Sequence, residues 1–226
     1  LTDQSETSEV TLLKPKATCV ITGGLGKIGF RMAYFLLQNY EANIALIGRR
    51  PYANLDDWLK ENDDFQNSEI VSILNNYKDQ ITYYSADCSD FHSMNQVFGT
   101  IEENFERIDV VIHAAGETES SSSDTPAVLL EKADFETQFK TKVAGTLVIE
   151  ELLSSRPDCH CVLMSSLSAQ LGGLGMAAYA GANLFLDSLV QKHYLQKKAG
   201  WYVINWDGWE FGTEKNQFLS VQEALE

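Results

Sequence analysis

The octapeptide TGGLGKIG at residues 22–29 stands between an apolar run typical of a β-strand and a segment with the apolar spacing of a helix. It holds the pattern G-x-G-x-x-G as Gly24, Gly26 and Gly29. In a strand–turn–helix unit, the first glycine permits a tight turn, the second lets the backbone approach a pyrophosphate, and the third allows close helix–strand packing. Unpaired N–H groups at the helix N-terminus then attract the anion. We therefore predict a dinucleotide cradle rather than a ligand-free glycine turn, formed by Thr22, Gly23, Gly24, Leu25, Gly26, Ile28 and Gly29.

On both sides of this stretch, short apolar runs alternate with helical segments. The predicted strands are residues 17–22, 42–47, 81–86, 109–114, 159–164 and 202–206. The predicted helices are residues 30–40, 92–105, 127–155 in two pieces and 179–199, with two weaker stretches within 52–78. Strands that alternate with crossover helices form a parallel sheet, and continuous apolar strands indicate that both of its faces are covered. The sequence therefore predicts an α/β fold, a Rossmann-like doubly wound parallel sheet with helices on both faces.

The composition suits one large domain, because 44% of the 226 residues are hydrophobic. We assign residues 17–226 to this domain and residues 1–16 to a linker or the remnant of a preceding subdomain. The net charge of −15 argues against nucleic-acid and membrane partners, since such a surface repels phosphates and anionic lipids. No apolar run is long enough to span a bilayer. The four cysteines lack zinc-site spacing and are predicted to be buried free thiols, which favours a cytoplasmic protein without a bound metal.

The second predicted strand is followed by two arginines, Arg49 and Arg50. A protein that prefers NAD usually has an acidic residue at about this point, where it binds the ribose hydroxyls. A guanidinium instead pairs with the 2′-phosphate of NADP. In so acidic a chain we therefore predict NADPH as the cofactor; the alternative is a solvated basic pair near Asp56 and Asp57.

Two further strand ends are expected to contact the cofactor. An Asp at the end of the third strand could accept a hydrogen bond from the adenine amino group, or could instead cap the next helix. Small residues after the fourth strand allow the backbone to pass close to the cofactor, whereas His113 beside them is predicted to be a packed side chain. The predicted contacts at these ends are Asp87, Cys88, Ala114, Ala115 and Gly116.

Carbonyl reduction needs an acid that protonates the developing alkoxide. Four polar side chains of this sequence could supply and support such an acid. Ser166 follows the fifth predicted strand, and Tyr179, thirteen residues later, begins the long helix. Asn183 shares a helical face with Tyr179 and could hold a relay water or a lysine. A nearby ammonium makes a phenol a better proton donor, and Lys142 in the preceding helix could supply one. A serine hydroxyl can hydrogen-bond the same carbonyl oxygen.

Several stretches resemble the ketoreductase domains of modular polyketide synthases and hybrid nonribosomal peptide synthetases, which belong to the short-chain dehydrogenase/reductase superfamily. The resemblance covers roughly residues 17–212 and is carried by TGGLGKIG, GRR, AD, HAAG, KVAGTL, SSLSAQLGGLGMAAYAGAN and NWDGW. It implies a catalytic tetrad of Lys142, Ser166, Tyr179 and Asn183. It also implies that NADPH reduces a ketoacyl thioester on the phosphopantetheine arm of a carrier protein, beside other synthase domains.

Some features depart from the pattern of other short-chain reductases, and others depart from the pattern of the synthase ketoreductases. In many short-chain reductases a lysine stands four residues after the tyrosine; here that residue is Asn183, and the upstream lysine is typical of the synthase ketoreductases. Residues 117–119 read ETE where family members often have Leu-Asp-Asp, and Leu171 stands in place of a marker tryptophan, so product configuration is not predicted. Little of the expected substrate lid follows NWDGW.

Two other functions compete with the reductase. One is a non-catalytic nucleotide-binding unit of a megasynthase, which a damaged tetrad would indicate. The other is a different short-chain enzyme, such as an epimerase or dehydratase, which usually keeps Tyr-x-x-x-Lys. All four polar groups are present and Tyr179 lacks that lysine, so we favour the reductase.

Overall fold

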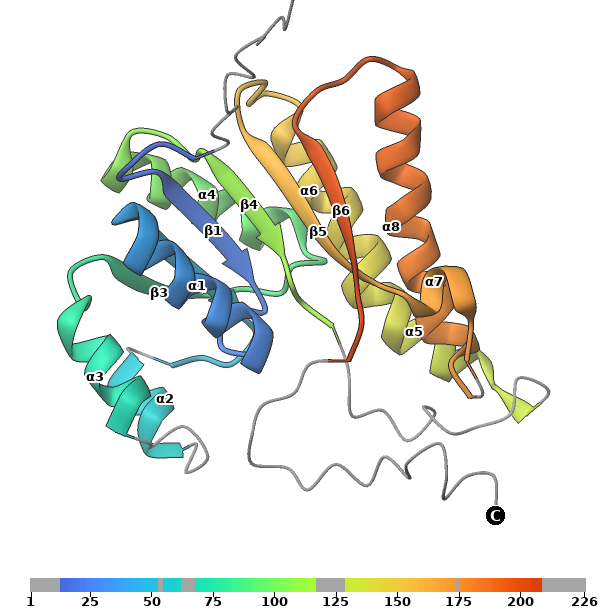
Figure 1. Cartoon of the computed structure of the whole chain (residues 1–226), viewed down its shortest axis with the longest axis horizontal. Helices are drawn as coiled ribbons and strands as arrows, with labels where there is room; N and C mark the ends of the chain where they lie inside the picture. The colour runs from blue at the N-terminus through green and yellow to red at the C-terminus, as the bar shows by residue number, and fades with distance from the viewer. Residues whose placement is uncertain (1–12, 53–54, 62–67, 117–128, 174, 209–226) are drawn as a thin grey trace, which may run out of the picture.

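The computed structural model describes residues 13–52, 55–61, 68–116, 129–173 and 175–208. Their centre is a six-stranded sheet in the order β3-β2-β1-β4-β5-β6, in which every neighbouring pair is parallel (Figure 1). The strands are β1 (Thr18–Thr22), β2 (Asn43–Gly48), β3 (Ile81–Ser85), β4 (Val110–His113), β5 (His160–Ser166) and β6 (Trp201–Trp206). The predicted Rossmann-like parallel sheet is therefore confirmed.

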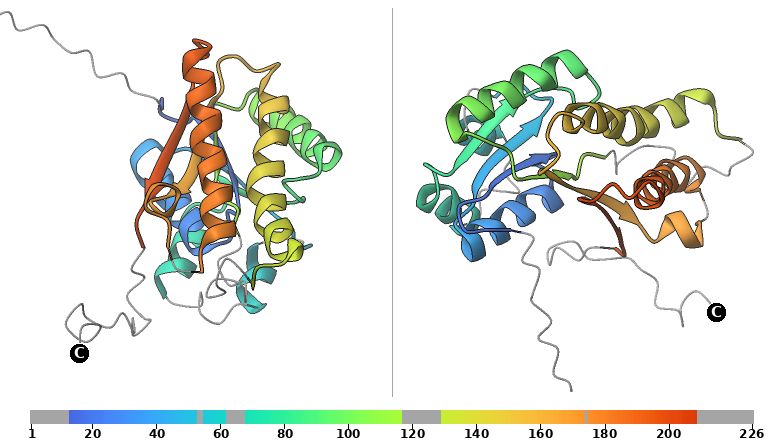
Figure 2. Two further views of the ribbon diagram at one scale, coloured as in Figure 1. Left: turned by 90° about the vertical axis from the view of Figure 1, so that its right-hand side faces the viewer. Right: turned by 90° about the horizontal axis from the view of Figure 1, so that it is seen from above.

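Helices cover both faces of the sheet, as the right-hand view of Figure 2 shows for α1 on one side and for α4 and α6 on the other. The helices are α1 (Lys27–Tyr40), α2 (Leu55–Glu61), α3 (Ser68–Asn76), α4 (Phe91–Phe105), α5 (Lys132–Phe139), the π-helical turn η3 (Lys140–Ala144), α6 (Gly145–Leu153), α7 (Ser168–Leu171) and α8 (Ala177–Leu195). Two separate apolar clusters result. Phe98, Ile149 and Leu186 belong to one, whereas Phe30 and Trp58 belong to the other.

The bounds of several helices and strands differ from the predictions. The helix predicted from residue 179 to 199 begins at Ala177 and ends at Leu195. It ends early because Lys197 and Gly200 adopt positive φ values of 56° and 87°, which an α-helix does not allow. The helical segment predicted from residue 127 begins at Lys132 and contains a π turn in its middle. The short helix α7 was not predicted, and β5 includes Ser166 instead of ending before it.

The carboxyl ends of the strands lie at one edge of the sheet, at the bottom of Figure 1, together with α7 and the start of α8. The strand order reverses between β1 and β4, because β1 pairs with β2 on one side and with β4 on the other. Ligands of open α/β sheets bind at such a point. No helix in the described parts of the chain is both long and apolar enough to cross a bilayer. The serine-rich segment at 117–125, residues 1–12 of the predicted linker and the chain beyond residue 208 lie outside the described residues.

Candidate active site

The glycine cradle forms the tight connection between β1 and α1. Gly23 has a φ of +68°, and a Cβ there would lie 2.7 Å from the Ala115 Cα. A Cβ on Gly29 would lie 2.4 Å from the Gly23 carbonyl oxygen, so the start of α1 packs directly on the turn. Gly26 is exposed and is the N-cap of α1, with no side-chain capping bond and no acidic residue in the first turn. The cradle therefore presents an uncapped helix N-terminus, which suits a phosphate group.

A buried pair joins the cradle to the end of β4. Thr22 Oγ1 and His113 Nδ1 are 2.6 Å apart, and both residues are almost completely buried. Burial and the charge of Lys142 lower the pKa of His113 to about 3, so its imidazole is neutral at physiological pH. His113 is a packed side chain, as predicted, and the Thr22 hydroxyl faces the interior.

The arginines after β2 are exposed and lie on a loop held by two tyrosines. The Tyr83 hydroxyl donates to the Arg50 carbonyl oxygen at 2.6 Å, and Arg50 Nη1 donates to the Tyr52 hydroxyl at 3.1 Å. Arg49 is also exposed. The loop is therefore anchored by its backbone, while both guanidinium groups are at the surface near the carboxyl end of β2.

Asp87, which follows β3, already has protein partners. One carboxylate oxygen accepts from the Ser89 backbone N–H and hydroxyl, and the other lies 2.9 Å from Lys140 Nζ. Burial opposes the charge, but these hydrogen bonds outweigh it and lower the pKa of Asp87 to about 2. The adjacent Cys88 is buried with its thiol toward the Thr141 carbonyl oxygen at 3.8 Å, and burial raises its pKa to about 11. Both residues thus contact the π turn.

The π turn η3 directs Lys142 into the protein. Lys142 is only 5% exposed, its Nζ donates to the Met164 carbonyl oxygen at 2.9 Å, and burial lowers its pKa to about 8. The carbonyl oxygen of Lys142 accepts from the Thr146 hydroxyl at 2.5 Å. A Cβ on Gly116 would lie 3.3 Å from Lys142 Cε, so the end of the β4 connection passes closely over the lysine. Ala114 and Ala115 lead the chain to this close approach.

The structure brings Tyr179 and Lys142 together. Lys142 Nζ lies 5.7 Å from the centroid of the Tyr179 ring, at the start of α8. Asn183, which is fully buried, donates from Nδ2 to the Tyr179 backbone carbonyl oxygen at 2.9 Å, and its Oδ1 finds no partner among the described residues. Ser166 Oγ accepts from the backbone N–H of Ser168 at 3.2 Å at the end of β5. The predicted contact of Asn183 with the lysine is not among these hydrogen bonds.

Sequence reasoning missed a polar network behind Ser166. The Asp187 carboxylate accepts hydrogen bonds from Ser165, Gln170 and Asn205. Its position eight residues after Tyr179, on the same helical face, was a signal that could have found it. The π turn, by contrast, has no recognisable signature in the sequence.

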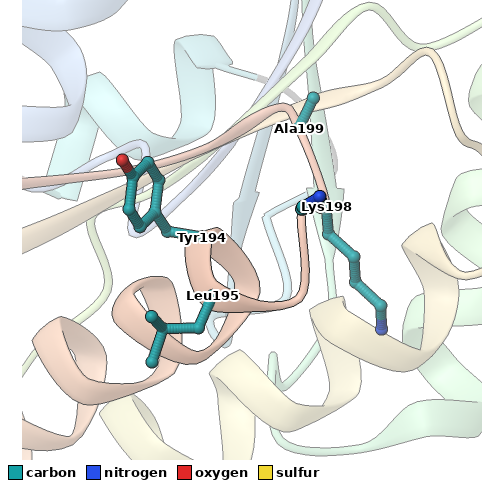
Figure 3. Close-up of a pocket in the computed structure, with 5 residues that line it drawn as sticks. Tyr194, Leu195, Lys198 and Ala199 are labelled. Carbon is teal, nitrogen blue, oxygen red and sulfur yellow. The ribbon is translucent and has the colours of Figure 1, made fainter.

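A surface hollow of about 480 Å³ lies away from these residues, at the far end of α8 (Figure 3). Its lining residues are Tyr194, Leu195, Lys197, Lys198 and Ala199. Tyr194 is fifteen residues after Tyr179, which corresponds to about 22 Å along a helix. The hollow therefore takes no part in the candidate site.

Comparison with known proteins identifies the family. A model of the KR domain matches residues 17–210. The chain belongs to the ketoreductase (KR) domain family. This match confirms the resemblance that the sequence motifs predicted. KR domains of polyketide synthases are oxidoreductases that act on ketone and hydroxyl groups.

Relatives of this KR domain are parts of large synthases. It is 33% identical over 204 residues to the polyketide synthase PksM of Bacillus subtilis (strain 168), covering 90% of this chain and 4% of PksM. It is 26% identical over 201 residues to the 6-methylsalicylic acid synthase of Penicillium expansum, covering 88% of this chain and 11% of that protein. The crystal structure of an N-terminal ketoreductase from the macrolactin assembly line superposes with a TM-score of 0.72 and 26% identity, covering 88% of this chain and 38% of that one.

Proposed function

We propose that this KR domain uses NADPH to reduce the ketone of an acyl thioester that a carrier protein presents on its phosphopantetheine arm. The observation that supports this proposal most directly is the Lys142 ammonium against the Tyr179 ring, 5.7 Å from its centroid. Tyr179 lies in the first turn of α8, and the start of α8 lies at the edge of the sheet where the strands end and β1 leads into the glycine cradle (Figure 1). Ligands of this fold bind at that edge.

The residues around the cradle fit a dinucleotide phosphate. The uncapped N-terminus of α1 beside Gly26 would hold the pyrophosphate, and Arg49 with Arg50 would pair with the 2′-phosphate. Asp87 and Cys88 would lie beside the adenine, and the connection Ala114–Gly116 beside the nicotinamide half. When bound, NADPH supplies the hydride that reduces the carbonyl carbon.

The four polar residues would handle the carbonyl oxygen. The Tyr179 hydroxyl gives its proton to this oxygen, and the Lys142 ammonium stabilises the phenolate that remains. The Ser166 hydroxyl donates a hydrogen bond to the same oxygen. Asn183 holds the first turn of α8 through the Tyr179 carbonyl, which keeps the phenol in place. The product is a hydroxyacyl thioester.

The partners that we propose follow from the relatives, which are multidomain synthases. They are a carrier protein and neighbouring synthase domains of a polyketide or hybrid nonribosomal peptide pathway. We also propose a cytoplasmic location, which agrees with four cysteines that are all free and buried.

The Tyr179→Phe variant tests the proposal. It removes only the hydroxyl, so it should bind NADPH normally in a fluorescence titration and lose at least about 100-fold in NADPH oxidation. The substrates are decalone and α-keto and β-keto pantetheine thioesters. Wild-type protein that binds NADPH without reducing any of them would indicate the non-catalytic alternative. A Tyr179→Phe variant with normal turnover would disprove the role of the phenol.

A further inference from the structure

Asp187 lies on the catalytic face of α8 but has no role in the mechanism so far. It follows Asn183 by four residues and Tyr179 by eight, so the three side chains share one face of the helix. Its Oδ1 accepts from the Ser165 hydroxyl at 2.7 Å. Its Oδ2 accepts from Gln170 Nε2 at 2.9 Å and from Asn205 Nδ2 at 2.8 Å. Three neutral donors thus surround one carboxylate.

These donors belong to the elements that flank Ser166. Ser165 precedes it in β5, Gln170 lies on α7, and Asn205 is the β6 residue directly opposite Ser165. Asn205 Nδ2 also donates to the Ser166 carbonyl oxygen at 3.2 Å. The position of Ser166 relative to α8 is therefore linked to the Asp187 carboxylate through these hydrogen bonds, beside a longer contact of 3.3 Å between the Ser165 hydroxyl and the Asn183 carbonyl oxygen.

We propose that Asp187 is a positioning residue, which sets the distance between the Ser166 hydroxyl and the Tyr179 hydroxyl. The proposal rests on the function proposed above, in which both hydroxyls contact the same carbonyl oxygen although they come from β5 and α8. Catalysis of this kind depends strongly on geometry, and a displacement of about 1 Å lowers rates by roughly 100-fold. Hydrogen bonds to a charged acceptor are the stronger kind and suit such a role.

A second anchor of α8 allows this role to be separated from simple helix docking. Near the other end of the helix, Glu150 of α6 lies 3.0 Å from His193 Nε2 and 3.4 Å from Lys192 Nζ. In both anchors one carboxylate lies close to nitrogen or hydroxyl groups of neighbouring residues, although Glu150 has two such neighbours, one of them an ammonium. Only the Asp187 anchor is connected to the end of β5 that carries Ser166.

The test compares Asp187→Asn with the matched control Glu150→Gln. The amide at residue 187 keeps the size of the side chain but places an N–H donor against groups that are themselves donors. We expect kcat for ketone reduction to fall roughly 10- to 100-fold in Asp187→Asn. The NADPH Kd from fluorescence titration should stay unchanged. Glu150→Gln should lower the thermal unfolding midpoint and leave kcat unchanged.

Two further variants apply if Asp187→Asn does not fold. Ser165→Ala and Gln170→Ala each remove one donor, and each should lower kcat roughly 3- to 10-fold without changing the NADPH Kd. The proposal is overturned if Asp187→Asn has the same kcat as Glu150→Gln. If Asp187→Asn does not fold, the proposal is overturned when Ser165→Ala and Gln170→Ala both have the same kcat as Glu150→Gln. Wild-type protein is measured alongside: if it reduces no ketone, the proposed function fails, whereas active wild type with unaffected variants disproves only the positioning role.

Discussion

Replacement of Lys142 by methionine is expected to stabilise the folded chain and to abolish ketone reduction. Burial lowers the pKa of Lys142 from 10.5 to about 8. At ~1.4 kcal/mol per pH unit, the buried ammonium destabilises the native state by about 3 kcal/mol at neutral pH. Loss of the hydrogen bond from Nζ to the Met164 carbonyl oxygen offsets about 1 kcal/mol of the gain. The variant should therefore be about 2 kcal/mol more stable at pH 7, which corresponds to a Tm increase of about 4–8 °C for a chain of this size.

The sign of the pH dependence follows from the same shift. The folded-state pKa of Lys142, about 8, lies below the unfolded value of 10.5, so the unfolded chain binds more protons between these two pH values. The stability of the wild type relative to the variant must then rise with pH in this window. The difference should narrow by about 2 kcal/mol between pH 7 and pH 9.5.

Urea denaturation without NADPH, followed by tryptophan fluorescence, measures this difference at both pH values. The control is Lys132→Met, because Lys132 is 89% exposed and its removal relieves no burial. NADPH oxidation should be lost in Lys142→Met and retained in the control. The reasoning is refuted if Lys142→Met is less stable than wild type at pH 7, or if its stability difference does not depend on pH.

Three other predictions concern the cofactor site and its supports. The double substitution Arg49→Ala, Arg50→Ala should raise the Kd for NADPH roughly 10- to 100-fold and leave the Kd for NADH unchanged, because it removes partners of the 2′-phosphate; fluorescence titration with both nucleotides checks this. Gly29→Ala should destabilise the chain in thermal unfolding and abolish NADPH binding, because the new Cβ would lie 2.4 Å from the Gly23 carbonyl oxygen. Gly99→Ala should raise the Tm in the same thermal unfolding assay, because Gly99 lies within α4 and a Cβ there would meet no other atom. Burial lowers the pKa of His113 to about 3, so the folded chain should lose stability as pH falls below the unfolded value of 6.5, because the unfolded chain gains the proton first. In urea denaturation, the free energy of unfolding of His113→Gln should decrease less between pH 7 and pH 4.5 than that of the wild type.

The fold could be predicted from the sequence because its determinants are local. The glycines of residues 22–29, the apolar strands and the periodic helices each act over a few residues, and together they allow few topologies. The helix ends were less accurate. The end of α8 depends on backbone conformations at Lys197 and Gly200 that composition does not dictate. Helix ends also fray, so their bounds are the least fixed part of a helix.

The sequence offered candidate residues for the site, but it did not predict the contacts that these residues make. The sequence placed Tyr179 and Asn183 on one face by spacing, and the structure brings Lys142 Nζ to 5.7 Å from the centroid of the Tyr179 ring. The π turn that directs this lysine is not encoded by any local pattern. Contacts at long sequence separation accompany it, such as the thiol of Cys88 toward the Thr141 carbonyl oxygen and the ion pair of Lys140 with Asp87. Such contacts form only when the sheet is assembled, so a local sequence pattern does not predict them.

Lys142 and Asp187 are charged groups that are both held by neutral partners, and this arrangement has a chemical consequence. Lys142 donates to a backbone carbonyl, and Asp187 accepts from a hydroxyl and two amides; within the described residues neither forms an ion pair. A carboxylate beside Lys142 would have removed the cost of burial, but it would also have cancelled the field of the ammonium at the Tyr179 ring. With a neutral partner, the full positive charge remains available to a phenolate that forms during the proposed proton transfer. The stability gained in Lys142→Met and the activity lost would then have one cause, an uncompensated charge at the place where negative charge develops.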